Sequence, residues 1–101
     1  MNETTTPVSL KDGASCKTFA AELTGRRGQP LKDVEVTFVL EGDGSLAADA
    51  QVKRLDCRTD GLGRAAISFN RLDVRGDMGA VLRAACECEA TLHLRLLAMT
   101  R

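Results

Sequence analysis

Cysteine is the residue type in this chain with the widest choice of chemistry, because a thiol can form a disulfide, bind a metal or stay inert in a core. The four cysteines are Cys16, Cys57, Cys86 and Cys88. Cys86 and Cys88 lie roughly 6.5 Å apart along an extended chain, which disfavours a bond between them. If the thiols oxidise, the favoured pair is therefore Cys57 with Cys86 or Cys88.

Two other interpretations of the cysteines stay open. A metal centre needs converging ligands, but the chain has no Cys-x-x-Cys pair, and His93 has the opposite strand parity to the inward cysteines. Inert thiols are the favoured interpretation, because a single disulfide leaves Cys16 and one more cysteine without an obvious partner. We therefore expect no metal and no cofactor.

The tripeptide Arg75-Gly76-Asp77 lies in a predicted loop where both charges should be exposed. An arginine and an aspartate on a tight glycine turn can bridge an acidic pocket and a metal ion, as in recognition by an integrin-type receptor. The alternative is an ordinary polar turn. We keep Arg75, Gly76 and Asp77 as a candidate exposed recognition loop.

The remaining acidic residues and the histidine offer little for catalysis. Asp43, Asp49 and Asp60 are too scattered to form a calcium loop, and the Asp43-Gly44 and Asp60-Gly61 pairs are typical of turns. A single histidine with no acid at motif spacing makes no catalytic triad. The sequence therefore predicts a protein that is not an enzyme, with no catalytic residues.

The elements that must position these residues are short strands separated by turns, since apolar residues recur with period two and glycines punctuate the chain. Phe19, Phe38 and Phe69 all fall on inward parity in different strands, as a two-sheet core would require. The predicted strands are residues 8–10, 17–24, 34–41, 51–58, 64–70, 82–89 and 91–96, of which 51–58 changes parity and is expected to be a bulged or weak edge strand.

This pattern predicts an all-β fold, a seven-strand antiparallel immunoglobulin-like β-sandwich. The second, fourth and sixth strands should run the same way, which places Cys57, Cys86 and Cys88 toward one end, beside the turns at Gly28 and Gly61. A disulfide from Cys57 would then cross from one sheet to the other.

The order and spacing of the motifs resemble the bacterial immunoglobulin-like domain of the invasin and intimin type (group 1). The resemblance covers residues 8–97, nearly the whole chain. The matching pieces are Phe19-Ala-Ala-Glu-Leu23, Gly28-Gln-Pro30, Val34-Glu-Val-Thr-Phe38, Gly42-Asp-Gly-Ser-Leu46, Thr59-Asp-Gly-Leu-Gly-Arg-Ala65 and residues 80–96.

The resemblance implies a non-enzymatic structural, spacer or adhesion module of a larger bacterial protein, at the cell surface or secreted, with neighbouring immunoglobulin-like repeats or other proteins as partners. On this interpretation residues 1–7 are a linker or flexible leader, 8–98 the domain and 99–101 a tail. The alternative is a stand-alone cytoplasmic module that recruits a partner protein through an edge strand or loop, because the N-terminus lacks the pattern of a signal peptide.

Composition supports one domain and excludes some partners. The chain has 101 residues, with 14 basic and 14 acidic side chains, so nothing in its charge favours nucleic acid. No apolar run approaches the roughly 20 residues that span a bilayer, so we expect no membrane insertion. An isolated domain of this kind is expected to be a monomer.

Overall fold

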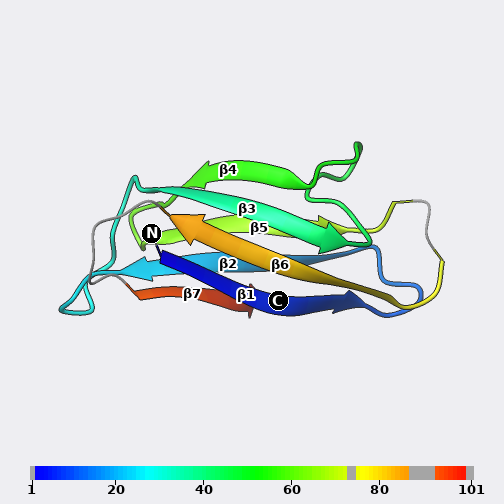
Figure 1. Ribbon diagram of the computed structural model, residues 1–101, viewed down its shortest axis with the longest axis horizontal. Coiled ribbons are helices and arrows are strands. Elements are labelled where there is room, and N and C mark those ends of the chain that lie inside the picture. Colours follow the sequence, from blue (N-terminus) through cyan, green and yellow to red (C-terminus); the bar gives the residue numbers. More distant parts are fainter. Residues whose placement is uncertain (1, 73–74, 87–92, 100–101) are drawn as a thin grey trace.

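The computed structural model describes residues 2–72, 75–86 and 93–99. Over these residues the regular structure consists of β-strands arranged in two antiparallel sheets, which confirms the predicted all-β class (Figure 1). The strands are β1 (Asn2–Leu10), β2 (Cys16–Thr24), β3 (Glu35–Gly42), β4 (Arg54–Arg58), β5 (Arg64–Asn70), β6 (Met78–Cys86) and β7 (His93–Met99).

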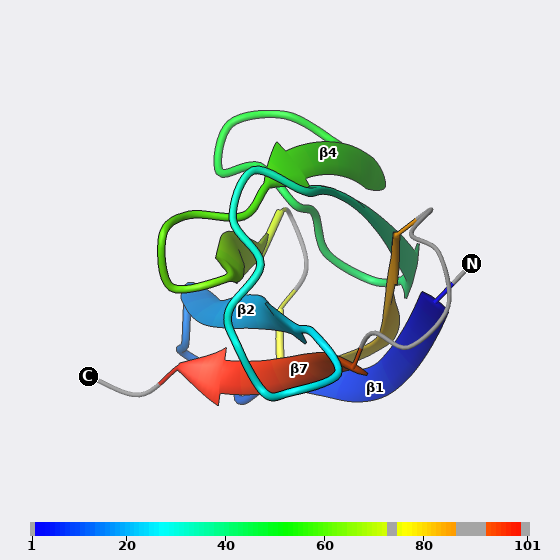
Figure 2. The same ribbon diagram turned by 90° about the vertical axis from the view of Figure 1, so that its left-hand side faces the viewer.

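The two sheets face each other with their strands roughly aligned (Figure 2). The four-stranded sheet has the order β1-β6-β3-β4, and the three-stranded sheet has the order β5-β2-β7. β2, β4 and β6 run in the same direction, as the sequence predicts, while β1 and β7 both run the opposite way (Figure 1).

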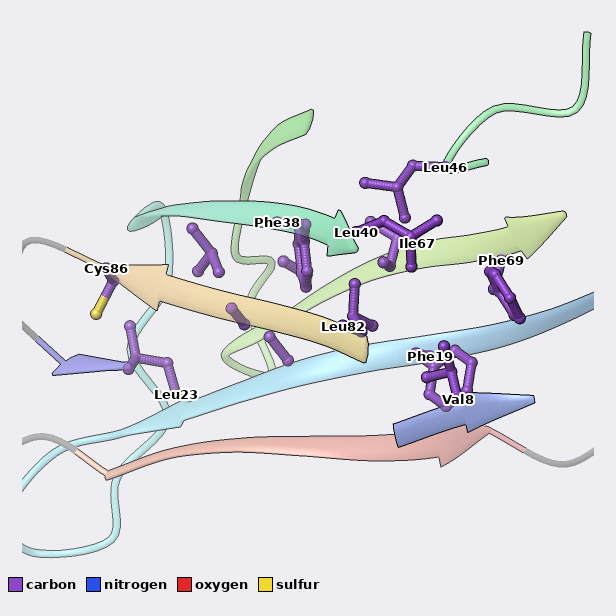
Figure 3. Packing of buried hydrophobic residues seen from close by; sticks show 14 of the residues in the cluster. Val8, Phe19, Leu23, Phe38, Leu40, Leu46, Ile67, Phe69, Leu82 and Cys86 are labelled. Atoms are coloured by element: carbon purple, nitrogen blue, oxygen red, sulfur yellow. The ribbon is translucent and has the colours of Figure 1, made fainter. Parts of the chain in front are cut away.

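The core lies between the sheets and is filled largely by side chains of β1, β2, β3, β5 and β6 (Figure 3). The three phenylalanines are buried, with exposed fractions of 4% at Phe19, 0% at Phe38 and 0% at Phe69, which confirms their predicted inward parity. Leu23 and Leu82 are also fully buried. Because aromatic rings bury the most apolar area per residue, these three rings contribute much of the free energy of folding.

β1 is longer than predicted. It runs from Asn2 and pairs with β6 over its whole length, from Asn2 opposite Cys86 to Leu10 opposite Met78. Most of the leader predicted over residues 1–7 is therefore strand, because backbone hydrogen bonds to β6 and an ion pair between Glu3 and Arg83 hold a polar segment in place. No apolar alternation over these residues predicts a strand.

The first and last strands do not pair with the strands next to them in sequence. β1 pairs with β6 in the four-stranded sheet, and β7 pairs with β2 in the three-stranded sheet. The β2–β7 register sets Leu94 opposite Leu23 and Leu96 opposite Ala21. Met99, predicted to begin a tail, still belongs to β7.

The turn between β4 and β5 closes one end of the sandwich. Gly63 has a φ of +74°, and a Cβ there would lie 2.6 Å from the carbonyl oxygen of Leu23. The Gly63 carbonyl oxygen in turn accepts a hydrogen bond from the backbone N–H of Leu23 at 2.7 Å. A side chain at Gly63 would therefore separate the turn from β2, which explains the glycine.

Candidate functional site

The predicted recognition loop lies between β5 and β6 and is fastened to the turn after β1. The Oδ1 atom of Asp77 accepts a hydrogen bond from the backbone N–H of Asp12 at 2.8 Å. In return, the Oδ1 atom of Asp12 accepts one from the backbone N–H of Gly76 at 3.1 Å. Arg75 is exposed. The Arg75-Gly76-Asp77 tripeptide is thus at the surface, but one oxygen of its carboxylate is used within the fold.

Arg71 binds the same two segments together. Its Nε atom donates to the carbonyl oxygen of Ala14 at 2.8 Å, and its Nη2 atom donates to that of Lys11 at 2.9 Å. The Arg71 backbone N–H donates to the carbonyl oxygen of Ser15 at 2.9 Å. The rigid fork of the guanidinium suits this bridging role. No sequence pattern marks Arg71, because the carbonyl groups that it binds are distant in the chain.

Cys57 and Cys86 lie in the same sheet, on either side of β3. Cys57 is opposite Val36, and Cys86 follows Ala85, which is opposite Thr37. Two strand spacings separate the cysteine Cα atoms by about 10 Å, which is beyond the reach of a disulfide. The predicted Cys57–Cys86 bond between sheets is therefore wrong, because β4 and β6 belong to one sheet. The two cysteines do lie toward one end of the sandwich, as expected.

Cys16 and Cys57 are free thiols. Cys86 is buried in the core (Figure 3), Cys57 is half-buried and Cys16 is exposed at the start of β2. Burial raises the pKa of the Cys57 thiol, and the neighbouring Asp56 carboxylate raises it further. Cys57 is therefore a weak nucleophile at neutral pH. Cys88 and its predicted pairing lie outside the described residues.

The aspartates considered as calcium ligands stand apart in the structure. The Oδ1 atom of Asp60 accepts hydrogen bonds from the backbone N–H groups of Leu62 at 2.8 Å and Arg64 at 3.1 Å, which hold the turn. Asp43 and Asp49 are exposed in another loop. Over the described ranges, no group of three or more histidine, cysteine, aspartate or glutamate side chains is arranged to hold a metal ion.

Ser45 organises the loop between β3 and β4. It is fully buried, and its Oγ atom donates to the carbonyl oxygen of Ala50 at 2.6 Å. The same atom accepts hydrogen bonds from the backbone N–H groups of Val52 at 2.8 Å and Ala47 at 3.1 Å. This hydroxyl therefore replaces regular backbone pairing within the loop, a structural role that the glycine-rich sequence did not reveal.

The outer edge of β4 is an unpaired sheet edge over the described residues. Within the described part of the chain, β4 pairs with β3 and has no strand on its other side (Figure 1). The Thr59 N–H donates to the carbonyl oxygen of Val34 at 3.0 Å, which fixes the alternation of hydrogen-bonded pairs along β4. It follows that the backbone N–H and C=O groups of Arg54, Asp56 and Arg58 point away from β3, toward the free edge.

The side chains of β4 leave this edge partly apolar on its inner side. Leu55 lies opposite the buried Phe38 but is 37% exposed, and Cys57 is half-buried opposite Val36. The parity change in the sequence predicted a weak edge strand over residues 51–58, and the five-residue β4 confirms a short edge strand there. Its position at the edge is why these two residues are not covered.

Comparison with protein-family models, with curated proteins and with solved structures finds no match. None of the described residues belongs to a helix long and apolar enough to cross a membrane.

Proposed function

We propose that the chain is a non-enzymatic immunoglobulin-like module that serves as a structural, spacer or adhesion unit of a larger bacterial protein, at the cell surface or secreted. The strand pairing supports an immunoglobulin-like assignment at the centre of each sheet. The β2–β5 and β3–β6 pairs correspond to the second-with-fifth and third-with-sixth pairs of that fold. β4 beside β3 corresponds to the added strand of the variable type.

The outer strands depart from that fold. In an immunoglobulin domain the first strand pairs with the second, and the last strand pairs with the sixth. Here β1 pairs with β6 and β7 pairs with β2, so the first and last strands have exchanged sheets. The immunoglobulin order and the order in this chain share the β2–β5 and β3–β6 pairs and differ only in the strands beside them. The proposed fold is therefore an immunoglobulin-like sandwich of seven strands in which the first and last strands have exchanged sheets.

The direction of the outer strands is the observation that carries the spacer proposal. β1 and β7 run the same way (Figure 1), so the chain enters near one end of the sandwich and β7 leads toward the other. The longest extent of the molecule is 43 Å. The Asp12–Asp77 and Arg71 hydrogen bonds fasten the loops at one end, which suits a unit that holds a fixed length.

The spacer proposal can be tested with three copies of the chain joined in one polypeptide. Small-angle scattering should give an extended particle that lengthens by about one module per copy, with the thermal midpoint of a single chain retained. A compact particle, or a lowered midpoint in the joined copies, would contradict the proposal. The gene sequence on either side of this stretch gives an independent measurement, because a module of a larger protein should lie beside similar repeats in one reading frame.

A stand-alone cytoplasmic module that recruits a partner protein is the second candidate, and the free edge of β4 favours it. An extended peptide can add a strand to such an edge. Replacing Asp56 by proline removes a backbone N–H that points to the edge, so strand addition should be lost while the β3–β4 pairing remains. A reading frame that begins and ends with this module would favour this candidate over a spacer.

A further inference from the structure

We propose that β4 pairs antiparallel with β4 of a second copy of this chain, about a two-fold axis at Cys57, to form a weak homodimer. The proposal rests on the free edge and the order of charges along it, and it is independent of the proposed function. From the sequence alone, an isolated domain of this kind is expected to be a monomer. The direction of the backbone groups of β4, on which the dimer depends, becomes known only from the pairing of β4 with β3.

Backbone geometry limits the ways in which two copies of β4 can pair. Residues that form a hydrogen-bonded pair across the axis must both point their N–H and C=O groups toward the free edge, as Arg54, Asp56 and Arg58 do. With the axis at Cys57, Asp56 of one copy exchanges both backbone hydrogen bonds with Arg58 of the second copy. The two Cys57 residues then form a non-hydrogen-bonded pair, in which Cα atoms lie about 4.5 Å apart.

The charges along β4 favour this register. On the outer face of the joined sheet, Asp56 lies opposite Arg58 of the second copy, and symmetry repeats this complementary pair. Arg54 faces the start of the turn that carries the acidic Asp60, which is not a ladder partner because its backbone N–H donates to the carbonyl oxygen of Arg64. Moving the axis to Asp56 would place Asp56 opposite itself and Arg54 opposite Arg58, so every charged pair would be repulsive.

An axis at Leu55 is the remaining competitor. It pairs Arg54 with Asp56, but it also places Arg58 opposite Val52, in the loop before β4, and Cys57 opposite Lys53. Each register forms one complementary pair, repeated by symmetry, within β4, and each contact extends past one end of the strand. The register at Cys57 is preferred because its Arg54 faces the turn that carries Asp60, whereas Arg58 in the other register faces the uncharged Val52.

The side chains that would meet across the axis are accessible and can change partner. Thr37 donates a hydrogen bond from Oγ1 to Oδ1 of Asp56 at 2.7 Å, which orients the carboxylate on the outer face. Arg58 Nη1 donates to the carbonyl oxygen of Asp33 at 3.0 Å and lies 3.4 Å from its Oδ1, with the two side chains 61% and 79% exposed. Because exposed ion pairs are weak and water can replace the exposed carbonyl bond, Arg58 can turn to the carboxylate of a second copy.

The length of β4 sets the strength of the dimer. Five residues give a contact well below the roughly 1,200 Å² of a standard protein interface. We therefore expect a dissociation constant of about 0.1 mM, so that dimers form at high concentration or when two copies are held close together.

Charge exchange is the decisive experiment, with dimerisation followed by sedimentation equilibrium up to millimolar protein. Asp56→Lys should weaken the dimer about tenfold, because symmetry creates two repulsive pairs. The double variant Asp56→Lys/Arg58→Asp should restore it. Restoration by Asp56→Lys/Arg54→Asp instead would place the axis at Leu55 and overturn the proposed register. A wild-type chain that stays monomeric at millimolar concentration would overturn the dimer itself.

Cysteine cross-linking gives a second readout in the folded chain. In a Cys16→Ser/Cys88→Ser background, the oxidant diamide should join two copies through Cys57, with diamide reduced to its hydrazine as the two thiols form one disulfide. The matched control Cys16→Ser/Cys57→Ser/Cys88→Ser should stay monomeric. Adding Asp56→Lys should slow cross-linking about tenfold. Cross-linking that is unaffected by Asp56→Lys would reflect random collision and contradict the proposal, and circular dichroism would verify that each variant is folded.

Discussion

The two outer strands of the four-stranded sheet, β1 and β4, differ in how long a pairing and how much buried side chain hold them to the sandwich. β1 pairs with β6 over nine residues and buries Val8 and Leu10 at its C-terminal half. β4 pairs with β3 over five residues, and its inner side chains Leu55 and Cys57 are only partly covered. Burial rather than pairing alone therefore distinguishes a secured edge from one that can accept another strand.

The segments that follow β1 and β4 are held by different kinds of hydrogen bond. After β1, Asp12 exchanges hydrogen bonds with Gly76 and Asp77, more than sixty residues away in the chain. After β4, Asp60 holds a local turn through Leu62 and Arg64. Side chains make the long-range link after β1, whereas after β4 the backbone makes it, because the Leu23 N–H donates to the carbonyl oxygen of Gly63.

Truncation of matched leucines should give the largest difference between the two strands. Leu10 is 3% exposed, so Leu10→Ala should lower the free energy of unfolding by about 2 to 4 kcal/mol through lost burial and a cavity. Leu55 is 37% exposed, so Leu55→Ala should cost about 1 kcal/mol or less. Urea unfolding of both variants measures this, and equal losses would remove the distinction between the two edges.

Removal of the long-range link should have the next largest effect. Asp77→Ala takes away the acceptor for the Asp12 N–H, and we expect a loss of about 1 kcal/mol in the free energy of unfolding. Arg75→Ala, in the same loop and exposed, is the control and should change it by less than about 0.5 kcal/mol. A larger effect at Arg75 than at Asp77 would show that the tripeptide stabilises the loop in another way.

The polar half of β1 offers a smaller change of opposite sign. Thr6 lies opposite the buried Leu82 and is half-buried on the inner face. Thr6→Val keeps the shape and removes a hydroxyl from this face, so it should raise the free energy of unfolding by about 0.5 kcal/mol. Thr5→Val, on the outer face, is the matched control. Destabilisation by Thr6→Val would mean that the hydroxyl contributes to holding β1.

The turn after β4 should give the smallest effect, and one that depends on pH. Hydrogen bonds from the backbone N–H groups of Arg64 and Leu62 lower the pKa of Asp60. A carboxylate whose pKa is lower in the folded state stabilises the fold above its unfolded pKa of about 3.9, and this contribution is lost as the pH falls through the folded value. Asp60→Ala should thus have a lower urea midpoint than wild type at neutral pH, and the gap should close in acid. A gap that persists in acid would assign the effect to something other than the charge.

The sequence pattern was sufficient to predict strands and their buried faces where side chains alternate between core and solvent. The inward parity of Phe38, Phe69 and Leu82 follows from period-two spacing, because a strand turns successive side chains to opposite faces. The pattern failed at Asn2–Thr6, where polar residues form a strand whose pairing partner supplies the hydrogen bonds. The roles of Arg71 and Ser45 could not be predicted, because each side chain binds backbone carbonyl groups, which every residue has.

The positions of Cys57 and Cys86 were likewise predictable only in part. Their position toward one end of the sandwich followed from strand order, but their placement on one sheet did not, because it depends on which strands pair.

Taken alone, the sequence determined the all-β class, most of the turns and the inward parity of the three phenylalanines, since each depends on residues close together in the chain. The tertiary structure decided that β1 pairs with β6, that Cys57 and Cys86 lie on either side of Val36, and that one edge of β4 is free. The physical reason is that strand pairing joins backbone groups that are identical in every residue. The choice of partner is therefore made by packing across the whole molecule rather than by local sequence.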